Sequence, residues 1–153
     1  MSKHERSVAA VAYPDRIIVE VRNKLDEYTW YSTADLVLLA TDISDSELGQ
    51  VVLDGLERSE EKKISYEEIR QLREQYRKKA KFKSEKATLV KARYVSIYGQ
   101  NGKIRFEPKE NKASKHAFYN LPDAIVELKK DTNDPSTVGR QLRNSWVACA
   151  FSD

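Results

Sequence analysis

Residues 39–56 read L-A-T-D-I-S-D-S-E-L-G-Q-V-V-L-D-G-L, and residues 128–146 read L-K-K-D-T-N-D-P-S-T-V-G-R-Q-L-R-N-S-W, so one short pattern occurs twice. The two stretches match when Pro135 is counted as one extra residue. The first set is then Asp42, Asp45, Leu48, Gly49, Val52 and Leu56, and its counterparts are Asp131, Asp134, Val138, Gly139, Leu142 and Trp146. The repeat predicts the same local structure in both halves of the chain.

Each copy is typical of a strand followed by a capped helix. An apolar run ends in a polar turn, an Asp can accept the free N–H groups of a first helical turn, and apolar residues then recur at helical spacing. Gly49 and Gly139 fall inside the two predicted helices, where glycine costs about 1 kcal/mol relative to alanine. We therefore expect each helix to pass close to another element at its glycine.

The rest of the chain supplies further strands and one more helix. Apolar, β-rich runs predict strands at residues 8–13, 16–22, 35–40, 88–98, 103–107, 123–128 and 147–151, with a polar loop at 108–115. Ser65 and Glu68 match a capping box, which predicts a helix that ends near residue 80. The first repeat helix is expected over about residues 45–60. This order favours one α+β (mixed α/β) domain over residues 1–153, with a mostly antiparallel sheet and about three helices.

Composition narrows the class of protein. With 40% hydrophobic and 33% charged residues the chain is typical of a globular, soluble protein. Its 27 basic and 24 acidic residues give a net charge of +3, which is too mild to indicate nucleic-acid binding by itself. No run of 18 apolar residues occurs and residues 1–6 are charged, so we expect a cytoplasmic protein with no membrane segment. The single Cys149 lies in an apolar stretch and is expected to be a small core residue.

The sequence offers little for catalysis. Neither His4 nor His116 has a partner at metal-binding spacing, and no glycine-rich phosphate loop occurs. His116 with Lys115, Tyr119 and a distant carboxylate could form a nuclease-like acid–base set, although a surface histidine beside a lysine is the ordinary case.

A group of carboxylates in the first repeat has two interpretations. Asp42, Asp45 and Glu47 could bind a hard cation, but their spacing lacks the further ligands of a calcium loop. Capping and the helix dipole explain acidic residues at this position more simply. We therefore expect no catalytic residues, no metal site, no cofactor and no enzymatic activity.

The first repeat resembles a family motif. Its D-x-x-D-x-E-L-G-x-x-V-x-x-x-L-x-x-S segment is formed by Asp42, Asp45, Glu47, Leu48, Gly49, Val52, Leu56 and Ser59, and V-G-R-Q-L-R-N-S at residues 138–145 looks like a weaker second copy. This arrangement resembles the immunity proteins of bacterial contact-dependent growth inhibition (CDI) systems. The resemblance implies a cytoplasmic protein that binds one cognate toxin domain, often a nuclease, one to one. Such a protein blocks the toxin without chemistry of its own.

Two charged regions are candidate binding surfaces. A nuclease with a basic substrate groove would attract acidic residues, and the densest acidic run consists of Asp54, Glu57, Glu60, Glu61, Glu67 and Glu68. The slightly basic total charge departs from strongly acidic nuclease inhibitors. Residues 70–83 interleave Tyr76 and Phe82 with basic side chains, which a small nucleic-acid-binding or regulatory module would use for phosphate contacts and stacking. A solvated helix face or an acidic protein partner explains the same residues.

Aromatic residues are a weaker indication of an interface. Tyrosine and tryptophan are enriched at protein interfaces because they bury much area while keeping a polar group. The candidates in predicted strands and loops are Tyr28, Trp30, Tyr31, Tyr94, Tyr98 and Tyr119. The same residues are also ordinary members of a hydrophobic core.

Overall fold

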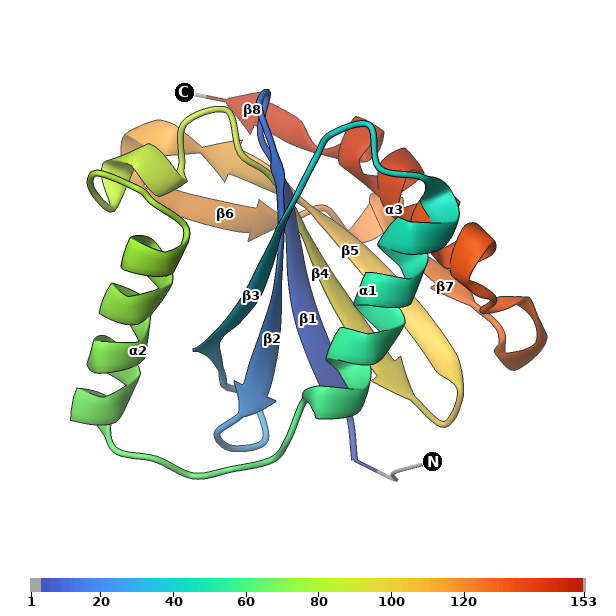
Figure 1. Cartoon of the computed structure of the whole chain (residues 1–153), viewed down its shortest axis with the longest axis horizontal. Helices are drawn as coiled ribbons and strands as arrows, with labels where there is room; N and C mark the ends of the chain where they lie inside the picture. The colour runs from blue at the N-terminus through green and yellow to red at the C-terminus, as the bar shows by residue number, and fades with distance from the viewer. Residues whose placement is uncertain (1–3, 153) are drawn as a thin grey trace.

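An eight-stranded sheet forms the middle of the protein (Figure 1). The computed structural model describes residues 4–152. In chain order the main elements are β1 (Arg6–Ala12), β2 (Ile17–Lys24), β3 (Trp30–Leu39), α1 (Asp45–Arg58), α2 (Tyr66–Lys79), β4 (Arg93–Gln100), β5 (Lys103–Lys112), β6 (Ala117–Asn120), β7 (Val126–Leu128), α3 (Pro135–Ala148) and β8 (Ala150–Ser152). A short 3₁₀ helix, η1 (Lys86–Thr88), lies between α2 and β4.

The sheet confirms the predicted α+β class. Its strands run in the order β3-β2-β1-β4-β5-β6, and β7 and β8 also pair with β5. All pairings are antiparallel except that of β5 with β8. No helix among the described residues is long and apolar enough to cross a membrane.

The two faces of the sheet carry different cores. Side chains alternate along β1, so Val8 and Ala10 lie in a large core beneath α1 and α3, whereas Val11 and Tyr13 lie in a smaller core on the opposite face. The smaller core is covered by the end of α2 and the chain that follows it. Figure 1 shows α1 and α3 together at one side of the sheet and α2 at the other. Part of the second face is therefore left without a helix.

The crossing of α1 and α3 explains both repeat glycines. A Cβ atom added to Gly49 would lie 1.7 Å from the carbonyl oxygen of Pro135, and one added to Gly139 would lie 1.9 Å from that of Asp45. Pro135 and Asp45 are the first residues of their helices, so the contact is reciprocal. The expected close approach is confirmed, and each helix is the partner of the other.

Helix caps agree with the sequence prediction only in part. Asp134 caps α3 by accepting the N–H of Thr137 at 3.2 Å, as expected, and Ser65 and Glu68 form the predicted capping box of α2. The prediction was wrong for α1, where Ser44 is the cap. Asp45 begins the helix and its carboxylate instead accepts a hydrogen bond from Arg143 Nε at 2.9 Å. When the caps Ser44 and Asp134 are aligned, the two helices match without a gap. The extra residue of the second copy therefore lies before its cap.

Several strand boundaries differ from those predicted. β5 continues through the expected loop at residues 108–112, because its outer half pairs with β6 and β8. β6 itself was not predicted. η1 ends at Thr88, where β4 was expected to begin, and β4 begins only at Arg93. β3 begins earlier than expected, at Trp30. At the other end α3 runs to Ala148 with Cys149 as its cap, so the last strand begins only at Ala150.

We expect Gly49→Ala and Gly139→Ala to lower the free energy of unfolding by about 1–3 kcal/mol or more, because the added methyl group meets a backbone carbonyl in a packed crossing. Urea denaturation measures the change. Gly99→Ala is the matched control, since its Cβ meets only the side-chain end of Leu56, at 3.3 Å. Equal stabilities for Gly49→Ala and the wild type would contradict this packing.

Candidate functional site

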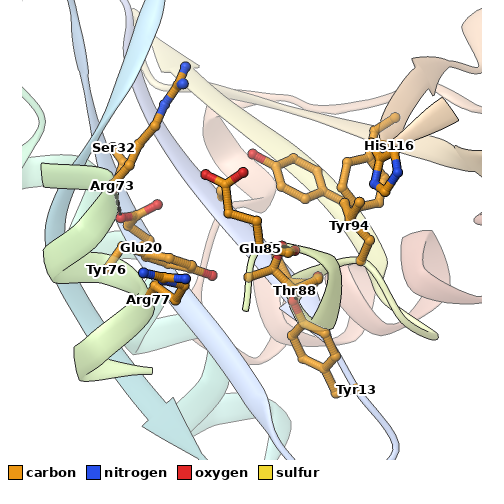
Figure 2. A pocket seen from close by; sticks show the side chains of 14 residues that line it. Tyr13, Glu20, Ser32, Arg73, Tyr76, Arg77, Glu85, Thr88, Tyr94 and His116 are labelled. Atoms are coloured by element: carbon orange, nitrogen blue, oxygen red, sulfur yellow. Dashed lines mark hydrogen bonds between the residues drawn. The ribbon is translucent and has the colours of Figure 1, made fainter. Parts of the chain in front are cut away.

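A cavity of about 350 Å³ opens over the face of the sheet that α1 and α3 do not cover (Figure 2). Its floor comes from β1 and β2, and its walls come from α2, from the connector that contains η1, and from β4 and β6. The lining residues are Ala9, Val11, Tyr13, Glu20, Ser32, Arg73, Tyr76, Arg77, Glu85, Thr88, Leu89, Tyr94, His116 and Phe118. Among the charged residues of this lining only Glu20 is buried, whereas Arg73, Glu85 and His116 are exposed at the mouth of the cavity.

Glu20 is the unusual residue of the cavity. Only 7% of its surface is exposed, yet no cation forms an ion pair with it among the described residues. Its Oε2 atom accepts hydrogen bonds from the Ser32 hydroxyl and, at 3.2 Å, from the N–H of Ala34. Burial raises the pKa of Glu20 to about 7, although these bonds and the charge of Arg22 oppose the rise.

A bulge in β3 holds Glu20 in place. Glu20 stands opposite Leu36 and Arg22 opposite Ser32, so residues 33–35 together face Val21. Ala34 adopts a φ of 59°, which turns its N–H towards the Glu20 carboxylate, and its carbonyl oxygen accepts a hydrogen bond from Lys79 Nζ at 2.9 Å. Bulges often re-aim groups beside functional sites. Here the bulge gives the carboxylate a hydrogen-bond donor that a regular ladder would not offer it.

Arg22 lies on the same face of β2 but is held by other partners. Its guanidinium donates to the hydroxyl of Ser7 at 2.6 Å and to that of Tyr94 at 3.4 Å. It also lies 5.4 Å from the ring centroid of Tyr98 and 5.9 Å from that of Trp30. The expected interface candidates Trp30 and Tyr98 thus pack around a partly buried arginine.

The phenols around the cavity remain neutral. Burial raises the pKa of Tyr13, Tyr76 and Tyr94 above the ordinary value. The hydroxyl of Tyr13 donates to the carbonyl oxygen of Thr88 at 2.6 Å, which fixes the η1 connector over the sheet. The cavity wall therefore has a defined position.

The structure does not assemble the acid–base set considered for His116. His116 is exposed, has a φ of 51° and lies on the cavity lining. Within residues 4–152, no hydrogen bond or ion pair joins it to Lys115, Tyr119 or a carboxylate. The ring of Tyr119 is instead contacted by Lys112, whose Nζ lies 4.5 Å from the centroid.

The aromatic residues of the basic stretch 70–83 pack inward. Phe82 lies 5.3 Å from Tyr13 and 6.4 Å from Tyr76 between ring centroids, and both Tyr76 and Phe82 pack against the smaller core. Arg70 pairs with Glu67 at 2.8 Å, and Arg77 pairs with Glu74. The interleaving that indicated nucleic-acid stacking is therefore that of an amphipathic helix and the turn after it.

The six predicted acidic residues run along one edge of the molecule. They occupy the C-terminal half of α1, the connector and the first turn of α2, a path that follows the lower edge of Figure 1. We call this set, Asp54, Glu57, Glu60, Glu61, Glu67 and Glu68, the acidic edge. All six are exposed, although Glu67 pairs with Arg70, Glu68 belongs to the capping box, and Lys62 and Lys63 interrupt the run.

Hydrogen bonds to β2 hold the middle of the acidic edge. The N–H of Lys24 donates to the carbonyl oxygen of Glu60 at 2.8 Å, and the N–H of Lys62 donates to that of Lys24 at 2.9 Å. The side-chain oxygen of Asn23 accepts the N–H of Glu60 at 2.9 Å. Glu60 and Glu61 therefore project from a fixed backbone.

Other predicted sites have structural roles. Asp45 pairs with Arg143, and the described residues contain no group of three His, Cys, Asp or Glu side chains that could hold a metal ion. Cys149 is buried at the end of α3, where burial raises the pKa of its thiol. The expectation of a core cysteine is confirmed.

Comparisons with known proteins agree with the resemblance of the repeat. The family model of CdiI, the CDI immunity protein, matches residues 6–149. The chain belongs to the CDI immunity protein family. No curated protein matches this CdiI-family chain. The match runs from β1 to the end of α3, so it includes all three helices and both glycines of the crossing and leaves out only β8 of the sheet.

Two solved structures share the fold of this CdiI-family protein. The protein of unknown function NMB0488 from Neisseria meningitidis superposes with a TM-score of 0.82 at 20% identity, covering 97% of this chain and 98% of that chain. A chain of the CdiA-CT/CdiI toxin and immunity complex from Yersinia pseudotuberculosis superposes with a TM-score of 0.81 at 17% identity, covering 95% and 98%. At these identities the likeness shows a common fold.

We expect Glu20→Gln to raise the free energy of unfolding of this CdiI-family protein above that of the wild type, and to raise it more at pH 8 than at pH 5. Ionisation of Glu20 penalises the folded state, because its pKa is about 7 there and 4.5 for a glutamate in water. The stability of the wild type therefore falls as the pH rises from 4.5 to about 7. At about 1.4 kcal/mol per pH unit, the whole loss of unfolding free energy is about 3 kcal/mol. Urea denaturation at the two pH values measures it. An equal difference in stability between the variant and the wild type at pH 5 and pH 8 would contradict the burial of the Glu20 carboxylate.

Proposed function

We propose that this chain is an immunity protein that binds and neutralises the toxin domain of its own CDI system. The observation that carries the proposal is the family match over residues 6–149. The fold shared with a chain of a toxin and immunity complex supports it. The exposed, structurally fixed acidic edge gives such a protein a surface that can meet a basic partner.

The proposed mode of action is occlusion. The toxin is the C-terminal domain of a large delivered effector, and we propose that it is a nuclease bound one to one in the cytoplasm of the producing bacterium. Binding across its substrate groove would protect the producer without any catalysis by the immunity protein.

The acidic edge is the proposed contact for a basic groove. Opposite potentials speed encounter and select one orientation of two proteins. Glu60 and Glu61 suit this role because hydrogen bonds to β2 fix their backbone, so little conformational entropy is lost on binding. Asp54 and Glu57 extend the same charge along α1.

Co-expression tests the proposed function. The chain is produced in a bacterial host together with the C-terminal domain of the large protein encoded beside it, and growth and co-purification are scored. We expect full rescue of growth and a stable complex. Loss of growth despite soluble expression of both proteins would contradict the immunity role.

We expect the variant Asp54→Asn, Glu57→Gln, Glu60→Gln, Glu61→Gln to bind the toxin domain about tenfold or more weakly, mainly through slower association, because rim charges act on the rate of encounter. Surface plasmon resonance at low and physiological salt measures the rates. Glu67 and Glu68 stay unchanged, since they stabilise α2. The control Lys78→Gln, Lys83→Gln also removes exposed charges and should bind normally. Unchanged association by the acidic variant would exclude this edge.

A further inference from the structure

The centre of the cavity is rich in hydrogen-bond acceptors. Figure 2 shows the carboxylates of Glu20 and Glu85 and the hydroxyl of Tyr94 turned towards the middle of the cavity. The guanidinium of Arg73 turns away from Glu20 in the same view, and Arg77 pairs with Glu74. The lining therefore presents carboxylates to an occupant while its own arginines are directed elsewhere.

Aromatic rings surround these acceptors. Tyr76 lines the cavity from α2, and Tyr94 and Phe118 line it from β4 and β6 with their ring centroids 4.8 Å apart. The faces of aromatic rings attract cations, and most strongly where water is excluded. Carboxylates framed by aromatic rings form a suitable environment for an organic cation.

The buried carboxylate lacks a counter-ion that such a cation would supply. The hydrogen bonds of Glu20 go to its Oε2 atom, from Ser32 and Ala34, and both donors are uncharged. Arg22 is the nearest cation in the strand but is committed to Ser7 and Tyr94. A buried charge without a partner is costly, and a cation with several donors offsets part of that cost when its hydrogen bonds are well aligned.

We propose that this cavity binds a guanidinium or ammonium group, and that in the toxin complex this group is a basic side chain of the toxin domain. The second half of the proposal rests on the proposed function. A guanidinium carries five N–H donors and an ammonium three, which suits a cavity lined by two carboxylates and phenolic oxygens. A volume of about 350 Å³ is at the small end of ligand pockets and fits one long side chain rather than a folded segment.

The choice of a basic side chain follows from charge complementarity. A protein that blocks a basic groove meets a partner surface rich in lysine and arginine, one of which can enter the cavity while others face the acidic edge. Burial of one such side chain against Glu20 would add a desolvated charge pair to a contact otherwise made of exposed charges.

The N–H of Ala34 is a direct reporter, because it donates to the Glu20 carboxylate. The ¹⁵N-labelled protein is titrated with n-propylguanidinium and with the uncharged n-propylurea at pH 8. We expect a saturable shift of the Ala34 resonance with the cation only, at least tenfold weaker in Glu20→Gln. Glu107→Gln is the control, since Glu107 pairs with Arg105 and Lys109 outside the cavity lining. No response, or an equal response in Glu20→Gln, would overturn the proposal.

The Ala34 resonance also tests whether a side chain of the toxin domain enters the cavity. In the complex we expect the Ala34 resonance to shift, and Glu20→Gln to weaken binding at least about tenfold while Glu107→Gln binds normally. A wild-type-like spectrum of Glu20→Gln shows that its fold is intact. A complex that forms equally well with Glu20→Gln and leaves Ala34 unmoved would refute toxin entry into the cavity. Failure of the wild type to bind any toxin domain would instead refute the proposed function, and the n-propylguanidinium result would then decide the cavity alone.

Discussion

The contact between Gly49 and Gly139 at the crossing of α1 and α3 is the constraint on which the rest of the fold depends. Each helix lies against the backbone of the first turn of the other, which only glycine permits at this distance. The crossing joins the two halves of the chain, and Trp146 extends the contact by donating its indole N–H to the carbonyl oxygen of Ala10 at 3.1 Å. One face of the sheet is thereby closed, and part of the other is left without a helix.

Stability and the proposed binding of a cation lie on different faces of the sheet. The face beneath α1 and α3 holds a continuous apolar core, including Leu48, Val52 and Leu142, each with no exposed surface. The opposite face tolerates a buried carboxylate, a partly buried arginine and a bulged edge strand, all of which cost stability. Functional sites are commonly where a fold departs from its most stable arrangement. The large core supplies the stability that this departure requires.

The sequence predicted the parts of the structure that depend on local patterns. Helical spacing and the repeat located α1 and α3, and the glycines indicated their close approach. Local patterns could not predict the pairing of strands that are distant in the sequence. The polar residues 108–112 continue β5 only because β6 and β8 lie beside them. Ser44 was missed as a cap because neighbouring aspartates fit the same role. The acidic edge was predicted only from the density of acidic residues along the sequence. That density could not show that Glu68 is engaged in the capping box of α2.

The cavity was not predicted, because its residues come from distant parts of the chain. Glu20 was not singled out from the sequence, although a single carboxylate within I-I-V-E-V was a signal of its burial. We propose that this protein neutralises a toxin domain by binding across its substrate groove. Titration of a fixed amount of active toxin domain with the purified protein tests it most directly. We expect a linear loss of toxin activity that reaches zero at one equivalent of the protein. Complete inactivation at a small fraction of an equivalent, or residual toxin activity at excess, would contradict neutralisation by one-to-one binding.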